Sequence, residues 1–538
     1  MKTTMGTGPL SQAELLQQAV ELYPECSIST WTGSGMRRNT FRDLGHDASR
    51  LAHLLSELGV EPGDRVGTFM WNNYEHLVAY HAIPAMGAVI HPLNIRLYAD
   101  QVGYIATHAR DKVVLVDGSL VDVFSACLPM MQAVRHVIVV NGGIDGLPKV
   151  GAVNVHRFEE LMNSQPDDAF KYPVMDECSP STVCYTSGTT GNPKAVVYSH
   201  RSNWLHAMYL CSANGLAVSA QDRVLPIVPM FHANGWGLPH ACLMAGSSIV
   251  MPDRFLKPVD LLHIMSEALP TFAAAVPTIW AGVLRELEGG DQDIRHLREI
   301  MVGGAALPRE LMEAFRSRHG VQLVHAWGMT ETSPLVTVAR PPAGLTGDCD
   351  ARYRLSQGRL PVGVSARIVD DNQNLVPRDG QSVGELQVRG PWITSSYHGA
   401  GDISAFSDGW LRTGDVGYIS PDGYLTLVDR SKDLIKSGGE WISSIQIENE
   451  VMGHSGVHEA AVVGIKHEKW GERPLVVVVR EPRAIVDAQE LRAYLDGKIA
   501  KWQVPEAWIF VEEIPKTSVG KFDKKQIRAM YEIGSLAL

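Results

Sequence analysis

The chain has 538 residues, which is too long for one compact core, so two or more domains are expected. Its 45% hydrophobic and 20% charged residues are typical of a globular protein, and the formal net charge of −11 argues against a nucleic-acid or anionic-lipid surface. No apolar run is long enough to span a bilayer, and residues 1–12 lack the apolar core of a signal peptide. The seven cysteines include no C-x-x-C pair, which argues against disulfides or a zinc site. We therefore expect a cytoplasmic protein.

Before Ile368, short β-branched runs alternate with segments of helical apolar spacing. In chain order, the pattern predicts a helix over residues 48–58, strands over 65–70, 113–116, 136–140, 181–184 and 195–198, and helices over 261–268 and 310–318. Strands that alternate with helices are typical of an α/β architecture with mainly parallel sheets.

From Ile368 the pattern changes to closely spaced turn signals such as Asp379-Gly380 and Asp422-Gly423. Short strands predicted over residues 384–389 and 424–428 indicate a small antiparallel β region.

A last segment reads as a compact α+β domain. It has a helix predicted over residues 445–452, strands over 460–465 and 475–479, and a helix over 488–499. We therefore expect an N-terminal domain over 1–429, a hinge over 430–432 and a small C-terminal domain over 433–538.

The most informative motif is the run YTSGTTGNPK at residues 185–194. Glycines let successive backbone N–H groups point inward as an anion-binding nest, and hydroxyls with Lys194 add donors and positive charge for a polyphosphate. The spacing is not that of a kinase-type P-loop. A flexible Ser/Thr/Gly linker is the alternative, and the predicted strands on both sides make it the weaker one.

The run at 185–194 resembles the phosphate loop of the adenylate-forming superfamily, which contains acyl-CoA synthetases, adenylation domains and beetle luciferases. Three further motifs match in the right order: WGMTE at residues 327–331, TGD at 413–415 and PKTSVGK at 515–521. The resemblance covers nearly the whole chain. It is strongest to the branch of medium-chain fatty acid and 3-(methylthio)propanoate CoA ligases.

The resemblance implies a large N-terminal domain of α/β subdomains with a small β region, followed by a small mobile C-terminal domain. The residues that it implies for ATP binding are Thr186, Ser187, Gly188, Thr189, Thr190, Gly191, Lys194, Gly304, Ala305, Ala306, His325, Ala326, Trp327, Gly328, Met329, Thr330, Asp415, Arg430 and Lys521. Within this set, His325 would meet the adenine amino group, Trp327 would pack on adenine or shape the acyl pocket, and Asp415 would accept hydrogen bonds from the ribose.

The residues that the resemblance implies for catalysis are Lys521, Lys194, His232 and Glu331. Taken alone, Lys521 could be one lysine of a solvated basic tail; in the family, the lysine at this position reaches the carboxylate and the α-phosphate during adenylation. Glu331 with Thr186 would bind Mg²⁺ that accompanies ATP, the alternative for Glu331 being an acid at the start of a helix.

The acyl substrate is expected to contact His232, Trp236, Val302, Gly303, Trp327, Gly328 and Pro334. Relatives that activate amino acids commonly place an aspartate where this chain has His232, so an α-amino acid is disfavoured. Trp236 is bulky and would favour a short or medium acyl chain, unless it is only a core aromatic.

For coenzyme A, the resemblance implies Lys436, Gly438, Gly439, Glu440 and Trp441, and it places the hinge at Lys432. The C-terminal domain would rotate about this hinge between the two half-reactions.

The predicted reaction is acid + ATP + CoA to acyl-CoA + AMP + pyrophosphate through an acyl-adenylate. The expected partners are ATP, CoA and a small carboxylic acid, without nucleic acid or a membrane span, and a homodimer is the expected assembly. A luciferase-like oxygenase, an enzyme that loads a carrier protein and an ATP-binding sensor with a dead site remain alternatives.

Overall fold

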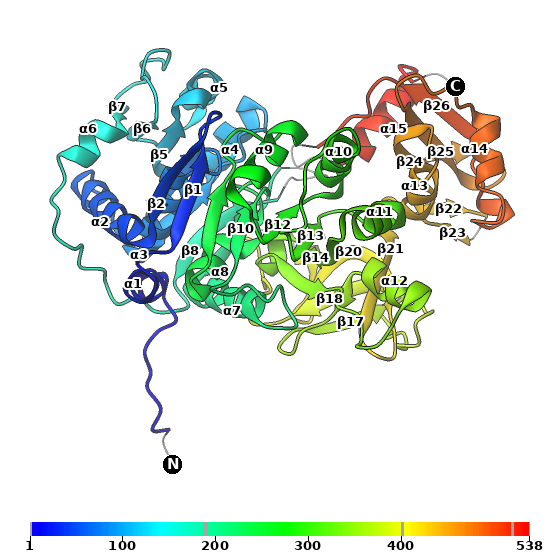
Figure 1. The fold of residues 1–538 in the computed structure, drawn as a ribbon, viewed down its shortest axis with the longest axis horizontal. Coiled ribbons are helices and arrows are strands. Elements are labelled where there is room, and N and C mark those ends of the chain that lie inside the picture. Colours follow the sequence, from blue (N-terminus) through cyan, green and yellow to red (C-terminus); the bar gives the residue numbers. More distant parts are fainter. Residues whose placement is uncertain (1–2, 187–191, 400–402, 439, 518–520, 537–538) are drawn as a thin grey trace.

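The computed structural model describes residues 3–186, 192–399, 403–438, 440–517 and 521–536. Figure 1 shows a large body formed by the blue-to-yellow part of the chain and a smaller body formed by its orange-to-red end. The large body combines two extended sheets with helices, whereas the smaller one contains one short sheet and its own helices. The predicted α/β fold class, with a small C-terminal domain, is confirmed.

The first sheet of the large body has the strand order β7-β6-β5-β3-β4-β8-β9 in the described part of the chain. Its strands are β3 (Arg65–Phe69), β4 (Val89–Pro92), β5 (Asp111–Asp117), β6 (His136–Val140), β7 (Asn154–Arg157), β8 (Pro180–Tyr185) and β9 (Ala195–Ser199). All neighbours run parallel except β8 and β9, which form an antiparallel pair at one edge.

The second sheet has the path β17-β18-β20-β21-β16-β15-β14-β13-β12-β10-β11-β1-β2, with β19 beside β20. Its strands pair antiparallel from β17 to β14 and parallel from β14 to β1, and β1 and β2 form an antiparallel pair at the far edge. Its strands are β1 (Ser27–Trp31), β2 (Met36–Thr40), β10 (Arg223–Pro226), β11 (Ser248–Met251), β12 (Phe272–Ala275), β13 (Glu299–Gly303), β14 (Gln322–Gly328), β15 (Leu335–Val338), β16 (Gly358–Arg359), β17 (Ser365–Val369), β18 (Gly384–Arg389), β19 (Phe406–Ser407), β20 (Trp410–Ile419) and β21 (Tyr424–Arg430). The predicted antiparallel region is thus continuous with the parallel strands through β14 and β15.

The helices of the large body are α1 (Gln12–Leu22), α2 (Phe41–Glu57), α3 (Tyr74–Ala85), α4 (Ala99–Ala109), α5 (Val121–Ser125), α6 (Phe158–Asn163), α7 (His200–Cys211), α8 (Leu238–Ala245), α9 (Pro258–Ala268), α10 (Pro277–Glu288), α11 (Arg309–His319) and α12 (Gly347–Leu355), with 3₁₀ turns η1 (Gly118–Leu120), η2 (Leu128–Met130), η3 (Ala233–Gly237), η4 (Thr330–Thr332) and η5 (Ile403–Ala405). Local chemistry sets several of their starts: Thr40 and Asp43 form a capping box for α2, and Pro258 begins α9, where its missing N–H costs nothing. Among the described residues, no helix is both long and apolar enough to cross a membrane.

The smaller body is built on the sheet β23-β22-β25-β24, with β26 beside β25. Its elements are β22 (Ile435–Ser437), β23 (Glu440–Ile442), α13 (Ser444–Met452), β24 (Val457–His467), β25 (Gly471–Arg480), α14 (Ala488–Tyr494), η6 (Lys501–Gln503), β26 (Ala507–Val511) and α15 (Lys524–Glu532). Buried apolar side chains of β24 and β25, such as Val462 and Val476, pack with Ile447 of α13 into a core of their own.

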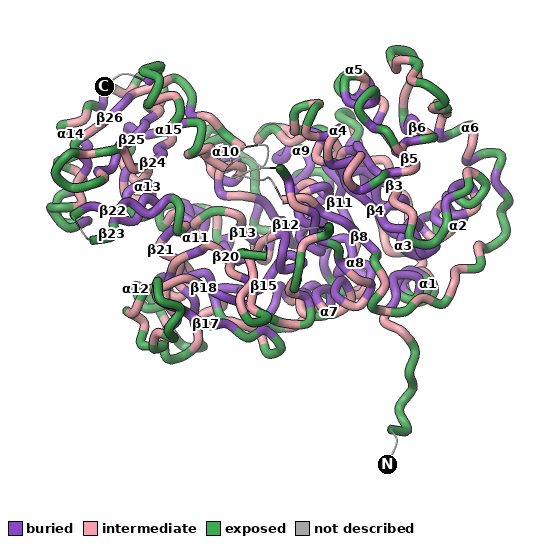
Figure 2. The backbone as a smooth tube through the Cα atoms, turned by 180° about the vertical axis from the view of Figure 1, so that it is seen from behind, coloured by how far each residue is buried: buried purple, intermediate pink, exposed green. Residues whose placement is uncertain are grey.

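Burial follows the predicted elements closely. Figure 2 shows buried backbone through both sheets and exposed backbone at the outer loops. The helix predicted over residues 488–499 is too long, because α14 ends at Tyr494 and a turn follows in which Gly497 has φ +76. That conformation suits glycine and breaks the helical repeat, although Leu495 and Ile499 stay buried as the apolar spacing indicated.

Candidate active site

The two ends of the predicted phosphate loop are fastened to each other. The Thr186 N–H donates to the Lys194 carbonyl oxygen at 2.9 Å, and the Lys194 N–H donates to Thr186 Oγ1 at 3.2 Å. β8 and β9 pair directly beneath, so the loop is mounted on the edge of a sheet. The other residues predicted for this loop lie outside the described residues: Ser187, Gly188, Thr189, Thr190 and Gly191.

At the end of β13, the side chain of Lys521 comes close to the backbone of Gly304. Gly304 follows Gly303 with φ +81, and a Cβ built on it would lie 3.4 Å from Lys521 Cε and 3.8 Å from Lys521 Nζ. A Cβ at these distances would be in ordinary contact with the lysine, so it is the left-handed backbone that favours glycine here. The structure therefore brings Lys521, at the C-terminal end of the chain, to the turn that carries Gly304, Ala305 and Ala306.

Described residues before position 518 and after position 520 pair with each other next to Lys521. The Thr517 N–H donates to the Lys521 carbonyl oxygen at 2.7 Å, and Lys516 pairs with Phe522 as an isolated β-bridge. Burial and the positive charge of Arg430 lower the pKa of Lys521 to about 8, while Asp415 opposes the shift. The side chain is thus an ammonium near neutral pH, placed in a partly desolvated position.

Glu331 is buried in η4, directly after β14. Burial raises the pKa of its carboxyl, which the Tyr397 hydroxyl, Arg430 and Lys194 oppose. The Tyr397 hydroxyl donates to Glu331 Oε1 at 2.7 Å, and the Tyr198 hydroxyl donates to the neighbouring Thr330 carbonyl oxygen at 2.6 Å. A buried carboxylate has chemistry suited to binding a cation.

Asp415 is oriented from two sides at the start of a β-bulge in β20. The Trp327 indole N–H donates to Asp415 Oδ2 at 2.8 Å, and Arg430 Nε lies 3.1 Å from Asp415 Oδ1. Asp415 and Arg430 are direct neighbours across β20 and β21, and Asp415 raises the pKa of Arg430. Each carboxylate oxygen retains a lone pair for a further donor. The Trp327 ring packs with Val336 and Val364 in the core under this region.

The His325 ring makes one contact in which both atoms are hydrogen-bond acceptors. Burial lowers the pKa of its ring, so the ring is neutral, and the short Nδ1 contact of 2.8 Å to the Ser356 carbonyl oxygen assigns the proton to Nδ1. Nε2 then carries a lone pair, yet it lies 3.3 Å from the Ala305 carbonyl oxygen. Two acceptors face each other there, which suits a bound donor group.

A left-handed turn carries Trp236. Ala233, Asn234, Gly235, Trp236 and Gly237 all have positive φ, between 44 and 74°, in η3. For non-glycine residues this conformation costs about 1–2 kcal/mol each.

The polar anchors of this turn are on the Asn234 side chain. Its amide donates to Asn203 Oδ1 at 3.0 Å, and Tyr80 donates to Asn234 Oδ1. Sequence reasoning missed the turn, although the pair Asn234-Gly235 followed by Gly237 was a usable signal, because these residues tolerate positive φ.

The acyl-pocket residues fall into two groups. The Trp236 indole lies against the end of β13, because a Cβ on Gly303 would be 3.4 Å from Trp236 Cη2. His232 precedes the turn, and burial with the positive charges of Lys521 and Arg96 lowers its pKa to about 3. It is therefore neutral and close to Lys521.

The other acyl-pocket residues form the framework between β13 and β15. Val302 is fully buried next to Gly303, and a Cβ on Gly328 would meet the Pro334 carbonyl oxygen at 2.0 Å, so only glycine fits there. Ala326 is buried in β14, and Met329 leads from this strand into η4.

The residues predicted for coenzyme A are separate from this assembly. They lie on β22 and β23 and on the turn between these strands, at the lower edge of the smaller body in Figure 1. Lys436 and Glu440 are exposed, Lys436 Nζ stands 4.5 Å over the Trp441 ring, and Trp441 is 42% exposed. Gly438 accommodates Trp470 at a place where a Cβ would be 2.8 Å from that ring. Gly439 lies outside the described residues.

Lys432, the predicted hinge residue, is exposed between the last strand of the large body and the first strand of the smaller one. Its carbonyl oxygen accepts a hydrogen bond from Arg528, which also pairs with Asp433 at 2.6 Å.

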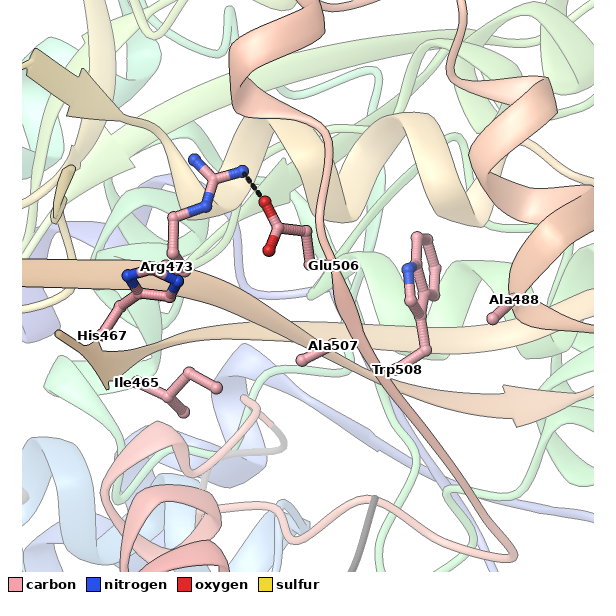
Figure 3. Close-up of a pocket in the computed structure, with 7 residues that line it drawn as sticks. All are labelled: Ile465, His467, Arg473, Ala488, Glu506, Ala507 and Trp508. Atoms are coloured by element: carbon pink, nitrogen blue, oxygen red, sulfur yellow. Dashed lines mark hydrogen bonds and ion pairs between the residues drawn. The ribbon is translucent and has the colours of Figure 1, made fainter. Parts of the chain in front are cut away.

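One hollow of the smaller body is lined by none of the predicted site residues. It measures about 400 Å³ and is lined by Ile465, His467, Arg473, Ala488, Glu506, Ala507 and Trp508. Figure 3 shows Arg473 and Glu506 turned toward each other across one end of it, where Arg473 Nη2 lies 3.4 Å from Glu506 Oε1. The ends of β13 and β14, rather than this hollow, are where the predicted residues meet.

Sequence reasoning missed Tyr397 and Arg96 as well as the turn at Asn234. Tyr397 is a single aromatic in a Ser/Thr loop, and nothing in its spacing indicates that it reaches Glu331. Arg96 follows β4 at a distance of 136 positions from His232, and no local pattern joins the two.

Comparisons with known proteins agree with this arrangement. A family model described as AMP-binding enzyme matches residues 16–398, and one described as AMP-binding enzyme C-terminal domain matches residues 446–521. The chain is 41% identical over 527 residues to the 3-methylmercaptopropionyl-CoA ligase of Ruegeria pomeroyi, covering 97% of each chain. It is 39% identical over 510 residues to the medium-chain-fatty-acid–CoA ligase of Ectopseudomonas oleovorans, covering 94% of this chain and 92% of the relative.

Two solved structures are similar over nearly their full length. The anthranilate CoA ligase AuaEII in complex with anthranoyl-AMP superposes with a TM-score of 0.88 at 24% identity, covering 99% of this chain and 100% of that one. ATP-bound MatB from Rhodopseudomonas palustris superposes with a TM-score of 0.81 at 27% identity, covering 97% and 99%.

Proposed function

We propose a two-step reaction for this chain, which belongs to the AMP-binding enzyme family. Its kinship with acid–CoA ligases over almost the whole chain makes it an AMP-forming acid–CoA ligase. In the first step a carboxylate oxygen attacks the α-phosphorus of ATP and the bond to the pyrophosphate oxygen breaks. In the second step the CoA sulfur attacks the acyl carbonyl carbon, the C–O bond to AMP breaks, and acyl-CoA leaves.

The observation that carries the proposal is the position of Lys521. A side chain from the last 20 or so residues reaches the Gly304 turn, close to His232 and Arg430. An ammonium at this place can offset the repulsion between an acid carboxylate and the α-phosphate as they approach. Because His232 is neutral, it adds no second positive charge beside the Lys521 ammonium.

Lys194 and Arg430 add positive charge, and both act on Glu331. Lys194 closes the phosphate loop, and Arg430 reaches across from β21 to Asp415. The remaining lone pairs of Asp415 suit the two hydroxyls of a ribose. No protein nucleophile is required, since positioning and charge stabilisation supply the catalysis.

The adenine amino group would fit at His325, where two hydrogen-bond acceptors face each other. An exocyclic amino group has two N–H donors, which could serve His325 Nε2 and the Ala305 carbonyl oxygen together. This assignment explains why a neutral imidazole faces a backbone carbonyl without a donor between them.

Mg²⁺ is proposed as the metal that accompanies ATP. The described residues contain no group of three or more His, Cys, Asp or Glu side chains that could hold an ion by themselves. Mg²⁺ typically takes one or two protein oxygens and completes its shell with phosphate and water, and the buried Glu331 with Thr186 fits that pattern. When bound, the ion would neutralise phosphate charge.

The acid is proposed to be short or medium in length and apolar, such as 3-(methylthio)propanoate or a medium-chain fatty acid. Trp236 against Gly303 limits the depth available behind the reacting carbonyl. His232, neutral and next to Lys521, offers no counter-ion for a substrate ammonium. The two relatives named above are ligases of these acid classes.

For the second half-reaction we propose that the C-terminal domain turns about Lys432, so that β22 and β23 replace the Lys521 loop at the site. Lys436, Gly438, Gly439, Glu440 and Trp441 would then contact the pantetheine arm. The seven cysteines are all unpaired, which supports a reducing cytoplasm as the location, and sedimentation would test the proposed homodimer.

The test is release of AMP and pyrophosphate from MgATP with a panel of acids, with and without CoA. The panel contains acetate, butyrate, 3-(methylthio)propanoate, octanoate, palmitate, a cinnamate and several amino acids. We expect CoA-dependent turnover that is highest on a short or medium apolar acid. Pyrophosphate exchange without CoA-dependent turnover would favour an enzyme that loads a carrier protein, and no reaction with any acid would favour the sensor.

A further inference from the structure

Tyr397 lies between two residues of the proposed site and contacts both. It follows β18 in the loop before η5, on a stretch rich in serine and threonine. We propose that Tyr397 is a positioning residue that holds the phosphate-loop lysine, Lys194, and the proposed metal carboxylate, Glu331, in a fixed relation. This inference rests on the proposed function and adds a residue to it.

The hydroxyl of Tyr397 orients the carboxylate. It donates to Glu331 Oε1 at 2.7 Å, and the Glu331 side chain is buried. A hydrogen bond to a charged group is among the stronger ones in proteins, so this bond helps to fix the orientation of the buried carboxylate. The bond engages one oxygen and leaves the second available to a cation.

The ring of Tyr397 supports the lysine. Lys194 Nζ stands 5.0 Å from the ring centroid, within the range of a cation–π contact. The Lys194 backbone is tied to Thr186 by two hydrogen bonds, so the ring acts on the part of the residue that the backbone does not fix. One side chain therefore contacts the cation of the loop with its face and the anion of η4 with its hydroxyl.

The loop that carries Tyr397 is fastened to the same two elements. The Thr394 N–H donates to the Glu331 carbonyl oxygen at 2.8 Å, and the His398 N–H donates to the Ala195 carbonyl oxygen at 2.9 Å. These bonds lie on either side of Tyr397, one to η4 and one to β9. The Phe406 ring packs edge-on against Tyr397 with ring centroids 5.5 Å apart. The position of the tyrosine is thus defined by the fold on three sides.

Because the two contacts use different parts of the ring, mutations can separate them. Tyr397→Phe removes the hydroxyl and keeps the face, whereas Tyr397→Leu removes both. Tyr353→Phe is the matched control, since the Tyr353 hydroxyl also donates to a carboxylate, Asp422 Oδ2 at 2.7 Å, but on the exposed surface.

The experiment measures binding rather than turnover. Mn²⁺ binding to the ATP-loaded protein is followed by electron paramagnetic resonance, and ATP binding without a divalent cation by calorimetry. For Tyr397→Phe we expect Mn²⁺ affinity to fall about tenfold while metal-free ATP affinity stays within about twofold, as one lost charge-assisted hydrogen bond implies. For Tyr397→Leu we expect both affinities to fall, and for Tyr353→Phe neither.

The inference is overturned if Tyr397→Phe binds Mn²⁺ as well as the parent protein, or more tightly, since the hydroxyl would then be neutral or blocking. It is also overturned if Tyr397→Leu leaves metal-free ATP affinity unchanged. Circular dichroism verifies that each variant folds, and the conservative phenylalanine variant carries the test if the leucine variant does not. A parent protein that binds ATP and Mn²⁺ and forms acyl-CoA keeps the proposed function intact under either result.

Discussion

Two segments of the C-terminal domain carry predicted site residues, one for catalysis and the other for coenzyme A binding, and they occupy different positions in the structure. Lys521 reaches the Gly304 turn of the large domain, and burial there lowers the pKa of its ammonium. The hairpin of β22 and β23, with Lys436 and Trp441, lies at the lower edge of the smaller body in Figure 1, and Trp441 is 42% exposed. Under the proposed domain rotation, this placement would be the one that serves adenylation, and thioester formation would need the hairpin to move toward the site.

The largest effect should come from removing the side chain at the Gly304 turn. We expect Lys521→Ala to slow pyrophosphate exchange by about 100-fold to 1,000-fold, the cost of losing one group that stabilises charge in the transition state. Thioester formation from supplied acyl-AMP should change by no more than a few fold, because the hairpin serves that step. Lys525→Ala, an exposed lysine in the next helix, is the control. Equal loss of both half-reactions would contradict the division of labour between the two segments.

The second way to sharpen the contrast is the pH dependence of each half-reaction. The pKa of Lys521 is lowered to about 8, so its ammonium is lost as the pH rises through that value. Pyrophosphate exchange should therefore decline above pH 8 by about tenfold per pH unit, while the reaction of supplied acyl-AMP with CoA should lack this decline. His232, with a pKa of about 3, should add no acidic limb near neutrality. In Lys521→Arg the decline should vanish even if the rate is low, because a guanidinium stays charged.

The same contrast shows what sequence reasoning could reach. Strands such as β6 and β18 and helices such as α11 were predicted almost to the residue, because their apolar spacing is local and regular. The residues proposed for the site were found by short motifs with fixed spacing. Their meeting at the ends of β13 and β14 is a property of the sheet order, which places distant segments side by side.

The features that were missed depend on contacts between distant segments or on unusual backbone. The left-handed turn at Trp236 is stabilised by the Asn234 side chain through Tyr80 and Asn203, which lie far away in sequence. Tyr397 is 66 positions from Glu331, and its loop contains no periodic pattern. The overlong prediction for α14 has a simpler origin: apolar spacing continued through Ile499, whereas Gly497 took a positive φ.

On the hairpin side, Trp441→Ala should reverse the pattern of Lys521→Ala. We expect thioester formation to fall about tenfold, as an aromatic anchor lost from a binding surface implies, with pyrophosphate exchange unchanged. Trp502→Ala is the matched control, since Trp502 is 44% exposed on the same domain but is not on the hairpin. A loss of pyrophosphate exchange in Trp441→Ala would show that the hairpin already acts in the adenylation arrangement.

The smallest effect concerns the contact that docks the C-terminal domain in the observed position. Arg285 of α10 lies 3.0 Å from His458 Nδ1 and 3.9 Å from Glu481 Oε1, so it joins the large domain to β24 and the segment after β25. Partly exposed pairs contribute about 0.2–1 kcal/mol, so Arg285→Ala should slow pyrophosphate exchange by no more than about fivefold.

Thioester formation in Arg285→Ala should stay level or rise, because the contact must break before the hairpin can approach. High salt should erase the difference between variant and parent, since screening weakens the pair in the parent and the variant has no pair to lose. Arg295→Ala removes an exposed ion pair with Asp293 inside the large domain and should leave both half-reactions alone. If Arg285→Ala slowed both half-reactions alike, the contact would stabilise the fold in general. A change confined to adenylation would instead show that the position of Lys521 depends on how the C-terminal domain docks. The contacts of Lys521 inside the site would then not be enough to fix that position.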